Sequence, residues 1–279
     1  MQSILFNDRI EKKYQVGISP DGIADLWLDF RSFLAPHGLT PVQEITSVAS
    51  VYFDNKDCDL LRYSLLGRLM LVRVRSYEVY GRPPRSINDY WVEVKTAASE
   101  RRAKRRFRVT KSALSDFLNG GGVGDEVIYR NGKDMDRDAF RDLYQETRET
   151  VFSFGLNPIL LVIYKRLAFQ SKSDRLSLDW DVQYHHVNRT IFDYDSWKYP
   201  LEEPIGRGDK VILEMKYLEG EIPSWFSELQ RQFPIERREY LKPVEGMKFL
   251  FQGPLKHHKQ ATHFLPMIEH YMANSWPLR

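Results

Sequence analysis

The chain has 279 residues, of which 42% are hydrophobic and 28% are charged. This is the balance of a soluble globular protein, and it excludes a largely disordered chain. Cys58 is the single cysteine, which excludes an intramolecular disulfide framework and a multi-cysteine zinc or iron–sulfur site. The formal net charge of +3 is too small for a protein that coats nucleic acid non-specifically, so we expect no nucleic-acid partner.

Targeting signals are missing from the sequence. No apolar run approaches the ~20 residues that a membrane-spanning helix needs. The N-terminal segment MQSILFNDRIEKKY lacks the apolar core and cleavage site of a signal peptide. We therefore expect a cytoplasmic protein with no membrane span in this chain, and we leave open whether it has a membrane partner and which oligomeric state it adopts.

Short segments of alternating charged and apolar residues dominate the first half of the chain. Alternate residues of a strand share one face, so each segment predicts a strand with a charged face and an apolar face. One helix is expected between the first two strands, from Pro20 to Ala35, where apolar residues recur at helical spacing. The strands 9–15, 69–78, 90–95 and 104–109 have charged faces that carry Arg9, Glu11 and Lys13; Arg73 and Arg75; Glu93 and Lys95; and Lys104, Arg106 and Arg108.

The second half of the chain mixes helices with two further strands of the same kind. Helices are expected from Met135 to Phe154, from Ser224 to Phe233, and in parts of the region after Met247. The strands 175–182 and 211–217 carry on their charged faces Arg175, Asp179 and Asp181, and Glu214 and Lys216, respectively.

Two architectures account for such strands. An open antiparallel sheet would turn its charged face to water. A closed barrel would turn that face inward and cover its apolar outside with the helices. The charged faces are rich in arginine and place carboxylates beside cations, which favours the barrel. We therefore predict an α+β fold, a closed antiparallel β-barrel with a charged lumen and helices packed outside. Residues 1–250 would form this domain, and 251–279 a helical C-terminal extension.

Motifs of several other enzyme classes are missing. The sequence has no GxxxxGK[ST], HExxH or GxSxG motif. The stretch NGGGVG (119–124) predicts a flexible loop rather than a phosphate cradle. The histidine pairs His185–His186 and His257–His258 have no spacing that marks metal ligands, and we expect surface or packing roles for them.

The residue types on the charged faces together indicate which kind of ligand the site binds. With Arg166 and Lys242 included, the expected lumen holds twelve cations and five carboxylates. Arginine grips phosphate oxygens with a planar fork, and lysine binds them as a point charge. Carboxylates suit Mn²⁺ or Mg²⁺ ions that also bind substrate phosphates. This set of residues is typical of a site that handles a polyphosphate chain with a divalent metal.

The sequence also resembles a known family across residues 8–247. It is similar to the VTC domain, the polyphosphate polymerase domain of the vacuolar transporter chaperone complex and its bacterial relatives, within the triphosphate tunnel metalloenzymes. The segments that carry the resemblance occur in the family's order: RIEKKY (9–14), VYFDN (51–55), VRVRSY (72–77), WVEVKT (91–96), AKRRF (103–107), YKRLAFQ (164–170), DRLSLDWDV (174–182), LEMKY (213–217) and YLKPVEGM (240–247).

The resemblance implies a tunnel fold and a role for each matching residue. Phosphoryl transfer would fall to the catalytic residues Lys13, Arg73, Arg75, Lys95, Arg166, Arg175 and Lys216. Substrate binding would fall to Glu93, Lys104, Arg106 and Lys242, and a Mn²⁺ or Mg²⁺ ion would be held by Glu214. From the charged strand faces alone, we add Arg9 and Arg108 as substrate-binding residues and Glu11, Asp179 and Asp181 as further candidate metal ligands.

One departure from the wider superfamily is informative. Triphosphatases and adenylyl cyclases of that superfamily open with ExExK, whereas this chain opens with RxExK, with Arg9 at the first acidic position. A cation there favours binding of phosphate over binding of a second metal. The expected activity is therefore an ATP-dependent polyphosphate polymerase whose partners are ATP and inorganic polyphosphate. A metal-dependent inorganic triphosphatase and a non-catalytic polyphosphate or inositol-phosphate binding module remain alternatives.

Overall fold

A computed structural model describes residues 9–42, 44–81, 90–98, 101–132, 135–194, 197, 202–218, 222–238 and 240–274. Its strands are β1 (Arg9–Val16), β2 (Thr40–Pro41), β3 (Thr46–Asp54), β4 (Met70–Val79), β5 (Tyr90–Ala98), β6 (Arg101–Val109), β7 (Asn157–Gln170), β8 (Arg175–His186), β9 (Gly206–Gly208), β10 (Val211–Leu218) and β11 (Ile235–Arg237). Its α-helices are α1 (Ile23–Leu34), α2 (Asp59–Leu65), α3 (Lys111–Leu118), α4 (Asp125–Asn131), α5 (Arg137–Ser153), α6 (Ser224–Gln232), α7 (Lys242–Gln252) and α8 (Ala261–Asn274), and short 3₁₀ helices span Pro20–Gly22, Ala35–His37 and Arg189–Asp193.

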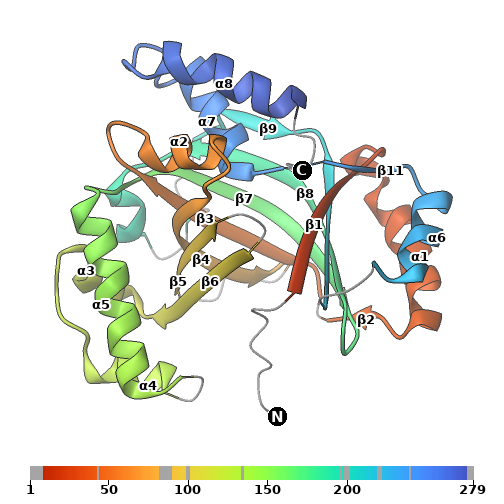
Figure 1. Ribbon diagram of the computed structural model, residues 1–279, viewed down its shortest axis with the longest axis horizontal. Helices are drawn as coiled ribbons and strands as arrows, with labels where there is room; N and C mark the ends of the chain where they lie inside the picture. Colours follow the sequence, from red (N-terminus) through yellow and green to blue (C-terminus); the bar gives the residue numbers. More distant parts are fainter. Residues whose placement is uncertain are drawn as a thin grey trace.

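The strands form one antiparallel sheet in the order β11-β1-β10-β8-β7-β3-β4-β5-β6, with β2 added to β7 and β9 to β8. The sheet is strongly curved (Figure 1). Glu11 on β1 acts electrostatically on Lys95 of β5, although these strands lie far apart in the sheet order. Within the described ranges no ladder joins β6 to β1 or β11. The predicted mixed antiparallel fold is thus confirmed, and the described sheet is curved but not closed by hydrogen bonds.

The apolar faces of the strands point outward and are covered by two groups of helices. Helices α3, α4 and α5 cover one end of the outer face, where Phe107 of β6 contacts Phe117, Phe140 and Tyr144. Helices α1 and α6 cover the other end of the same face, over β1, β8 and β10 (Figure 1). The helices predicted from residue 20, residue 135 and residue 224 are confirmed, because their apolar stripes face these strands.

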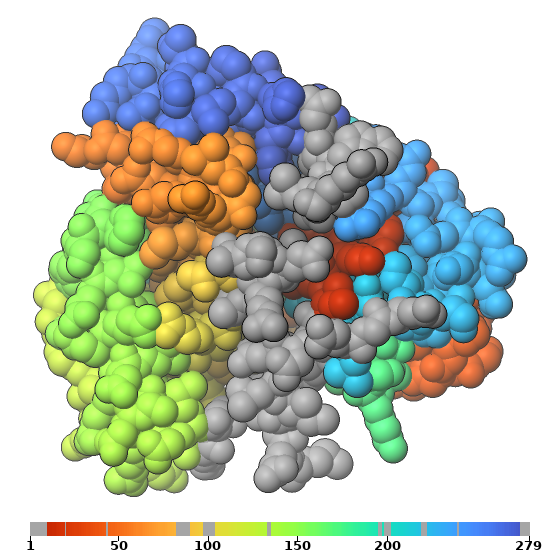
Figure 2. All heavy atoms as spheres, viewed as in Figure 1, coloured from red at the N-terminus to blue at the C-terminus, as the bar shows by residue number. Residues whose placement is uncertain are grey.

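A third group of helices occupies the inner side of the sheet. Helix α7 packs with α8 and α2 against concave-face residues of β3, β7 and β8. Gly246 permits this contact, since a Cβ there would lie 2.4 Å from Leu160 Cδ2 and 2.8 Å from Tyr184 Cδ1. The prediction that helices pack only outside was therefore wrong for α7, which covers one end of the concave face. Figure 2 shows the three helix groups around the centre of this side, where part of β1 (red) is visible.

The C-terminal region continues from the sheet without a break in the described chain. Helix α7 crosses residue 250, the predicted domain boundary, and α8 packs on α7. Whether 251–279 is a separate extension stays a prediction. None of the helices in the described part of the chain has the length and apolar character needed to cross a membrane.

Candidate active site

Glu93 lies at the centre of a cluster of cations on the concave face. It is fully buried and stands directly opposite Arg73 in the β4–β5 ladder. Its Oε2 lies 2.6 Å from Arg73 Nε and 4.0 Å from Arg75 Nη1, and its Oε1 lies 2.5 Å from Lys104 Nζ. Burial raises the pKa of Glu93, but Arg73, Arg75 and Lys104 together lower it well below the usual range. One carboxylate therefore compensates the two arginines and favours the charged form of Lys104.

The two arginines of β4 are held in place on several sides. Both are nearly buried, and they lie two residues apart on one face of the strand. Arg73 Nη1 donates to Tyr52 Oη at 3.1 Å, and Arg75 Nε donates to Ser50 Oγ at 2.8 Å. Arg75 Nη1 also donates to Tyr77 Oη at 3.4 Å. The guanidinium groups are therefore oriented before any ligand arrives.

The cations of β6 line the more open edge of the same cluster. Arg106 lies with its guanidinium carbon 4.1 Å from the centroid of the Trp91 ring and with Nη1 3.8 Å from Glu93 Oε1. Arg108 also stacks on Trp91, at 5.4 Å, and donates to the carbonyl of Arg130 on α4 at 3.1 Å. These side chains are half-exposed or near the rim, so they suit the guidance of a ligand more than its tight enclosure.

A second cluster joins β7, β8 and α7. Arg166 donates to Asp179 through two parallel bonds, Nε to Oδ1 at 2.6 Å and Nη2 to Oδ2 at 2.8 Å. Lys242, at the start of α7, donates to Asp179 Oδ2 at 2.7 Å and lies 4.5 Å from the centroid of the Tyr164 ring. Arg166 and Lys242 lower the pKa of Asp179 despite its burial. Both oxygens of Asp179 are thus engaged by cations, which leaves it poorly suited to the predicted role of metal ligand.

A third cluster contains two more carboxylates of the concave face, Glu11 and Glu214. Lys216 Nζ lies 3.1 Å from Glu11 Oε2 and 3.0 Å from Glu214 Oε1. Lys13 Nζ lies 3.8 Å from Glu11 Oε1 and donates to the carbonyl of Tyr240 at 2.8 Å. Burial raises the pKa values of Glu11 and Glu214, and the charge of Glu214 adds to this for Glu11. The surrounding lysines, joined at Glu214 by Arg166, nevertheless bring both pKa values well below the usual range.

Lys95 faces this third cluster from β5. Glu11 raises the pKa of Lys95, but burial, Arg73 and Lys216 lower it to about 7. For Lys104, burial and Arg73 outweigh Glu93 and lower the pKa to about 6. Lys95 and Lys104 therefore titrate near neutral pH, and an anionic ligand bound beside them would favour their charged forms.

The carboxylates offer limited means of holding a metal. In the part of the chain that the structure describes, no group of three or more His, Cys, Asp or Glu side chains is arranged to hold an ion. Glu11 and Glu214 share Lys216 and act on one another, so their oxygens lie close together. Two hard oxygen donors suit Mn²⁺ or Mg²⁺ when phosphates supply the remaining ligands. The residues fit such an ion only together with a substrate.

The prediction that Asp181 shares the inner face with Asp179 was wrong. The β7–β8 register shifts between Ile163 and Lys165, and Asp181 adopts a left-handed backbone with φ +51°. This β-bulge reverses the alternation of β8, because one extra residue changes which side chains point inward. Asp181 consequently lies on the outer face, where its Oδ2 is 3.0 Å from Lys165 Nζ.

For two further predicted site residues, only the pairing of their strands shows which face of the sheet they occupy. Arg175 lies opposite Lys216 and Arg9 opposite Leu218, so both register positions belong to the inner face. The side chain of Arg9 lies outside the described part of the structure. The predicted site residues that the inner face does bring together are Lys13, Arg73, Arg75, Lys95, Arg166, Lys216, Glu93, Lys104, Arg106, Arg108, Lys242, Glu214, Glu11 and Asp179.

Sequence reasoning missed the hydroxyl groups of the site. Tyr52 and Ser50 on β3 orient the β4 arginines, and Tyr164 lies under Lys242 and Arg166. Tyr240 contacts Lys13 through its carbonyl. The tyrosines belong to the segments VYFDN, YKRLAFQ and YLKPVEGM; Tyr52 lies between the outward-facing Val51 and Phe53, and Tyr164 follows the outward-facing Ile163. The alternation of residues along a strand is enough to predict that Tyr52 and Tyr164 lie on the inner face of the sheet.

Comparison with known proteins identifies the family of this chain. A family model described as VTC domain matches residues 8–251. Vacuolar transporter chaperone complex subunit 4 of Schizosaccharomyces pombe is 26% identical over 242 residues, which cover 75% of this chain and 32% of that protein. The chain therefore spans about a third of the length of this relative.

The chain is also partly similar in structure to two solved proteins. A candidate adenylate cyclase from Bacillus halodurans is 14% identical, with a TM-score of 0.44 over 85% of this chain and 97% of that one. A candidate adenylyl cyclase from Hippeastrum, described as having a dominant triphosphatase activity, is 12% identical, with a TM-score of 0.45 over 86% of this chain and 95% of that one.

Proposed function

This chain belongs to the VTC domain family, and from that premise we propose that it is an ATP-dependent polyphosphate polymerase. It would transfer the γ-phosphoryl group of ATP to the end of a growing inorganic polyphosphate chain. The observation that carries the proposal is the concave face, where Arg73, Arg75, Lys95, Arg166 and Lys216 converge with cations in excess over carboxylates. Such an excess of fixed positive charge suits a polyanion.

The reaction needs no protein nucleophile. A terminal oxygen of the polyphosphate chain attacks the γ-phosphorus, a new P–O bond forms, and the bond between that phosphorus and the β–γ bridging oxygen breaks to release ADP. Phosphoryl transfer depends mainly on positioning and on stabilisation of charge on the transferred group. Arg73 and Arg75 would hold successive phosphates with their two forks, since both already point from one strand into the same space.

The remaining groups would hold the two substrates in line. Arg166 and Lys216 would bind further phosphate oxygens in exchange for part of their contacts with Asp179 and Glu214. Lys104, Arg106 and Lys242 would guide the polymer along the concave face. Glu11 and Glu214 would hold a Mn²⁺ or Mg²⁺ ion, which when bound neutralises phosphate charge and orients the phosphates.

The decisive experiment is to incubate the purified chain with ATP and Mn²⁺ and resolve the products on a gel. Polyphosphate chains together with ADP are expected. Release of orthophosphate alone would identify a triphosphatase, and binding of triphosphate without turnover would identify a binding module. Arg73→Ala should abolish most of the product. Asp181→Asn is the matched control, because this charged residue lies on the outer face.

A further inference from the structure

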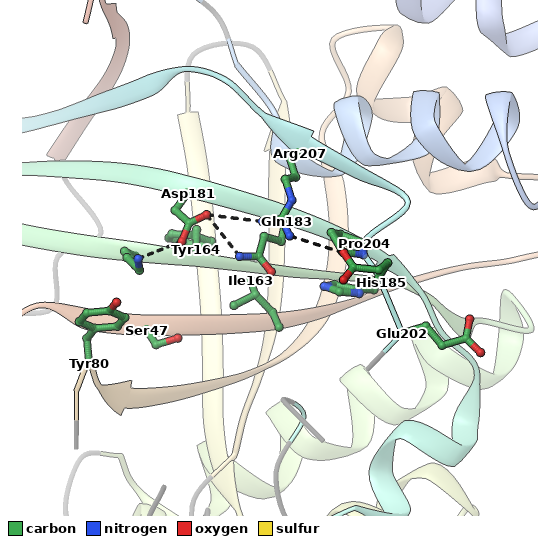
Figure 3. Close-up of a pocket in the computed structure, with 12 residues that line it drawn as sticks. Ser47, Tyr80, Ile163, Tyr164, Asp181, Gln183, His185, Glu202, Pro204 and Arg207 are labelled. Atoms are coloured by element: carbon green, nitrogen blue, oxygen red, sulfur yellow. Dashed lines mark hydrogen bonds and ion pairs between the residues drawn. The ribbon is translucent and has the colours of Figure 1, made fainter. Parts of the chain in front are cut away.

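A separate cavity lies on the outer face of the sheet, on the other side of the strands from the cation clusters. Its volume is about 460 Å³, within the range typical of small-ligand sites. Strands β3, β7 and β8 form its floor, and the segment 202–207 that leads into β9 borders it (Figure 3). The residues that matter for its chemistry are Lys165, Asp181, His185, Glu202, Glu203 and Arg207.

The β-bulge of β8 creates the polar part of this cavity. Asp181, turned outward by its left-handed backbone, contacts Lys165 at 3.0 Å and accepts a hydrogen bond from Gln183 Nε2 at 3.2 Å. Arg207 Nη1 lies 3.9 Å from Asp181 Oδ1 (Figure 3). The charge of Lys165 is therefore compensated within the protein, and its Nζ packs 4.4 Å from the centroid of the Tyr80 ring.

The charge balance of the cavity is opposite to that of the concave face. Arg207 lies 3.8 Å from Glu203, an almost fully exposed side chain. The carboxylate of Glu202 has no ion-pair partner among the described residues, and it too borders the cavity. Three carboxylates thus face two cations, which disfavours phosphate and favours a cationic ligand.

His185 supplies an unused acceptor at the base of the cavity. The residue is 5% exposed, and its Nε2 has no hydrogen-bond partner in the described structure. Burial lowers the pKa of His185, so the ring is neutral at pH 7, while a hydrogen bond to the backbone of Glu202 acts to raise it. A neutral ring that donates through Nδ1 to this backbone keeps its lone pair on Nε2, the nitrogen that has no partner. A buried lone pair without a donor is costly, and a ligand N–H would satisfy it.

We propose that this outer cavity binds a small organic cation with N–H donors, a guanidinium or primary ammonium group. Such a group would donate to His185 Nε2 and lie near the carboxylates of Glu202 and Glu203. This site is independent of the polymerase proposal, since its charged side chains lie on the outer face, across the sheet from the Arg73 and Arg166 clusters.

Agmatine, which carries a guanidinium and an ammonium group, is the probe for this site. The ring nitrogens of His185 are followed by NMR in the full chain during titration, and binding is measured by calorimetry. We expect the Nε2 resonance to move toward that of a hydrogen-bonded nitrogen. We also expect His185→Leu to weaken binding by about tenfold, the effect of one lost hydrogen bond of ordinary strength. Glu202→Gln should weaken it as well.

The neighbouring histidine provides the matched control. His186 lies on the other face of β8, so His186→Leu should leave agmatine binding unchanged. Arg73→Ala should also leave it unchanged, which separates this site from the phosphate site. Comparison with a Gly-Arg-Gly peptide shows whether the cation is better accepted as a free molecule or as a protein side chain. An unmoved His185 resonance, or equal binding to wild type and His185→Leu, would overturn the proposal.

Discussion

The guanidinium of Arg73 is held by the carboxylate of Glu93, with Nε 2.6 Å from Oε2, and both side chains are buried on the concave face. The arginine expected to grip a phosphate is therefore already engaged by an internal anion. A polyanion would share or exchange this contact on binding. The pair also makes Arg73 part of the folded framework, which the strand pattern alone did not indicate.

Arg73→Ala should lower the rate of polyphosphate synthesis by ~10²–10³, the usual effect of removing one preorganised charge donor from a site of this kind. Arg73→Lys should recover only part of the rate, because lysine keeps the charge but loses the fork. Initial rates at saturating ATP and Mn²⁺ measure both variants. Wild-type rates for Arg73→Ala would remove this residue from the proposed mechanism.

Glu93→Gln should destabilise the protein markedly, because it leaves the buried guanidinium groups of Arg73 and Arg75 facing one another without their shared anion. Loss of one partner from a buried ion pair typically costs about 3–5 kcal/mol. Triphosphate should restore more stability to the variant than to the wild type, since it replaces the missing negative charge. Urea unfolding with and without triphosphate measures both effects.

Glu146→Gln is the control for that substitution. Glu146 on α5 forms two contacts with Arg105, one of them 2.6 Å from Nη2 to Oε1, but this pair is exposed on the outside of β6. Exposed pairs contribute about 0–1 kcal/mol. A loss as large as that of Glu93→Gln would show that burial is not what gives the Glu93 cluster its importance.

The free energy of unfolding should rise between pH 7 and pH 9. The pKa of Lys95 is lowered to about 7 and that of Lys104 to about 6, from 10.5. Above the folded pKa and below the unfolded one, the unfolded chain binds more protons than the folded chain, so stability increases with pH. Bound triphosphate should reduce this slope, because it favours the charged lysines. Urea titrations at three pH values test it, and a slope that bound triphosphate leaves unchanged would exclude both lysines from ligand binding.

Glu214→Gln should raise the Mn²⁺ concentration needed for half-maximal turnover by at least ~10-fold, since even groups that only support a metal ligand have effects of this size. The amide removes the charge with little change in shape. Asp181→Asn makes the same chemical change on the outer face and should have no such effect. Equal Mn²⁺ requirements for the two variants would show that Glu214 is not a ligand.

Gly246→Ala should destabilise the protein by about 1–3 kcal/mol, as overpacking of a core does. The added methyl group would lie 2.4 Å from Leu160 Cδ2, so either α7 or the buried Leu160 and Tyr184 side chains must shift. Gly124→Ala is the control, because a Cβ there meets nothing within 4 Å. Thermal unfolding compares the two, and a stable Gly246→Ala variant would mean that α7 is free to shift.

The alternation of residue types along the strands determines much of this fold. In β4, Val72 and Val74 face the outer core while Arg73 and Arg75 face inward. Period-2 patterning suffices there because a strand without irregularities turns successive side chains to opposite faces. The long helix α5 was equally predictable, since its apolar stripe repeats over many turns and Asp136 caps its start.

Tertiary structure alone decided three features. The left-handed backbone at Asp181 inserts a bulge that moves this carboxylate to the outer face, and alternation cannot reveal where a strand gains a residue. Packing of α7 inside the sheet depends on the space left beside Leu160 by Gly246. The pairing of Arg73 with Glu93 depends on the register of β4 against β5, which is set by contacts between strands rather than by the pattern within either one.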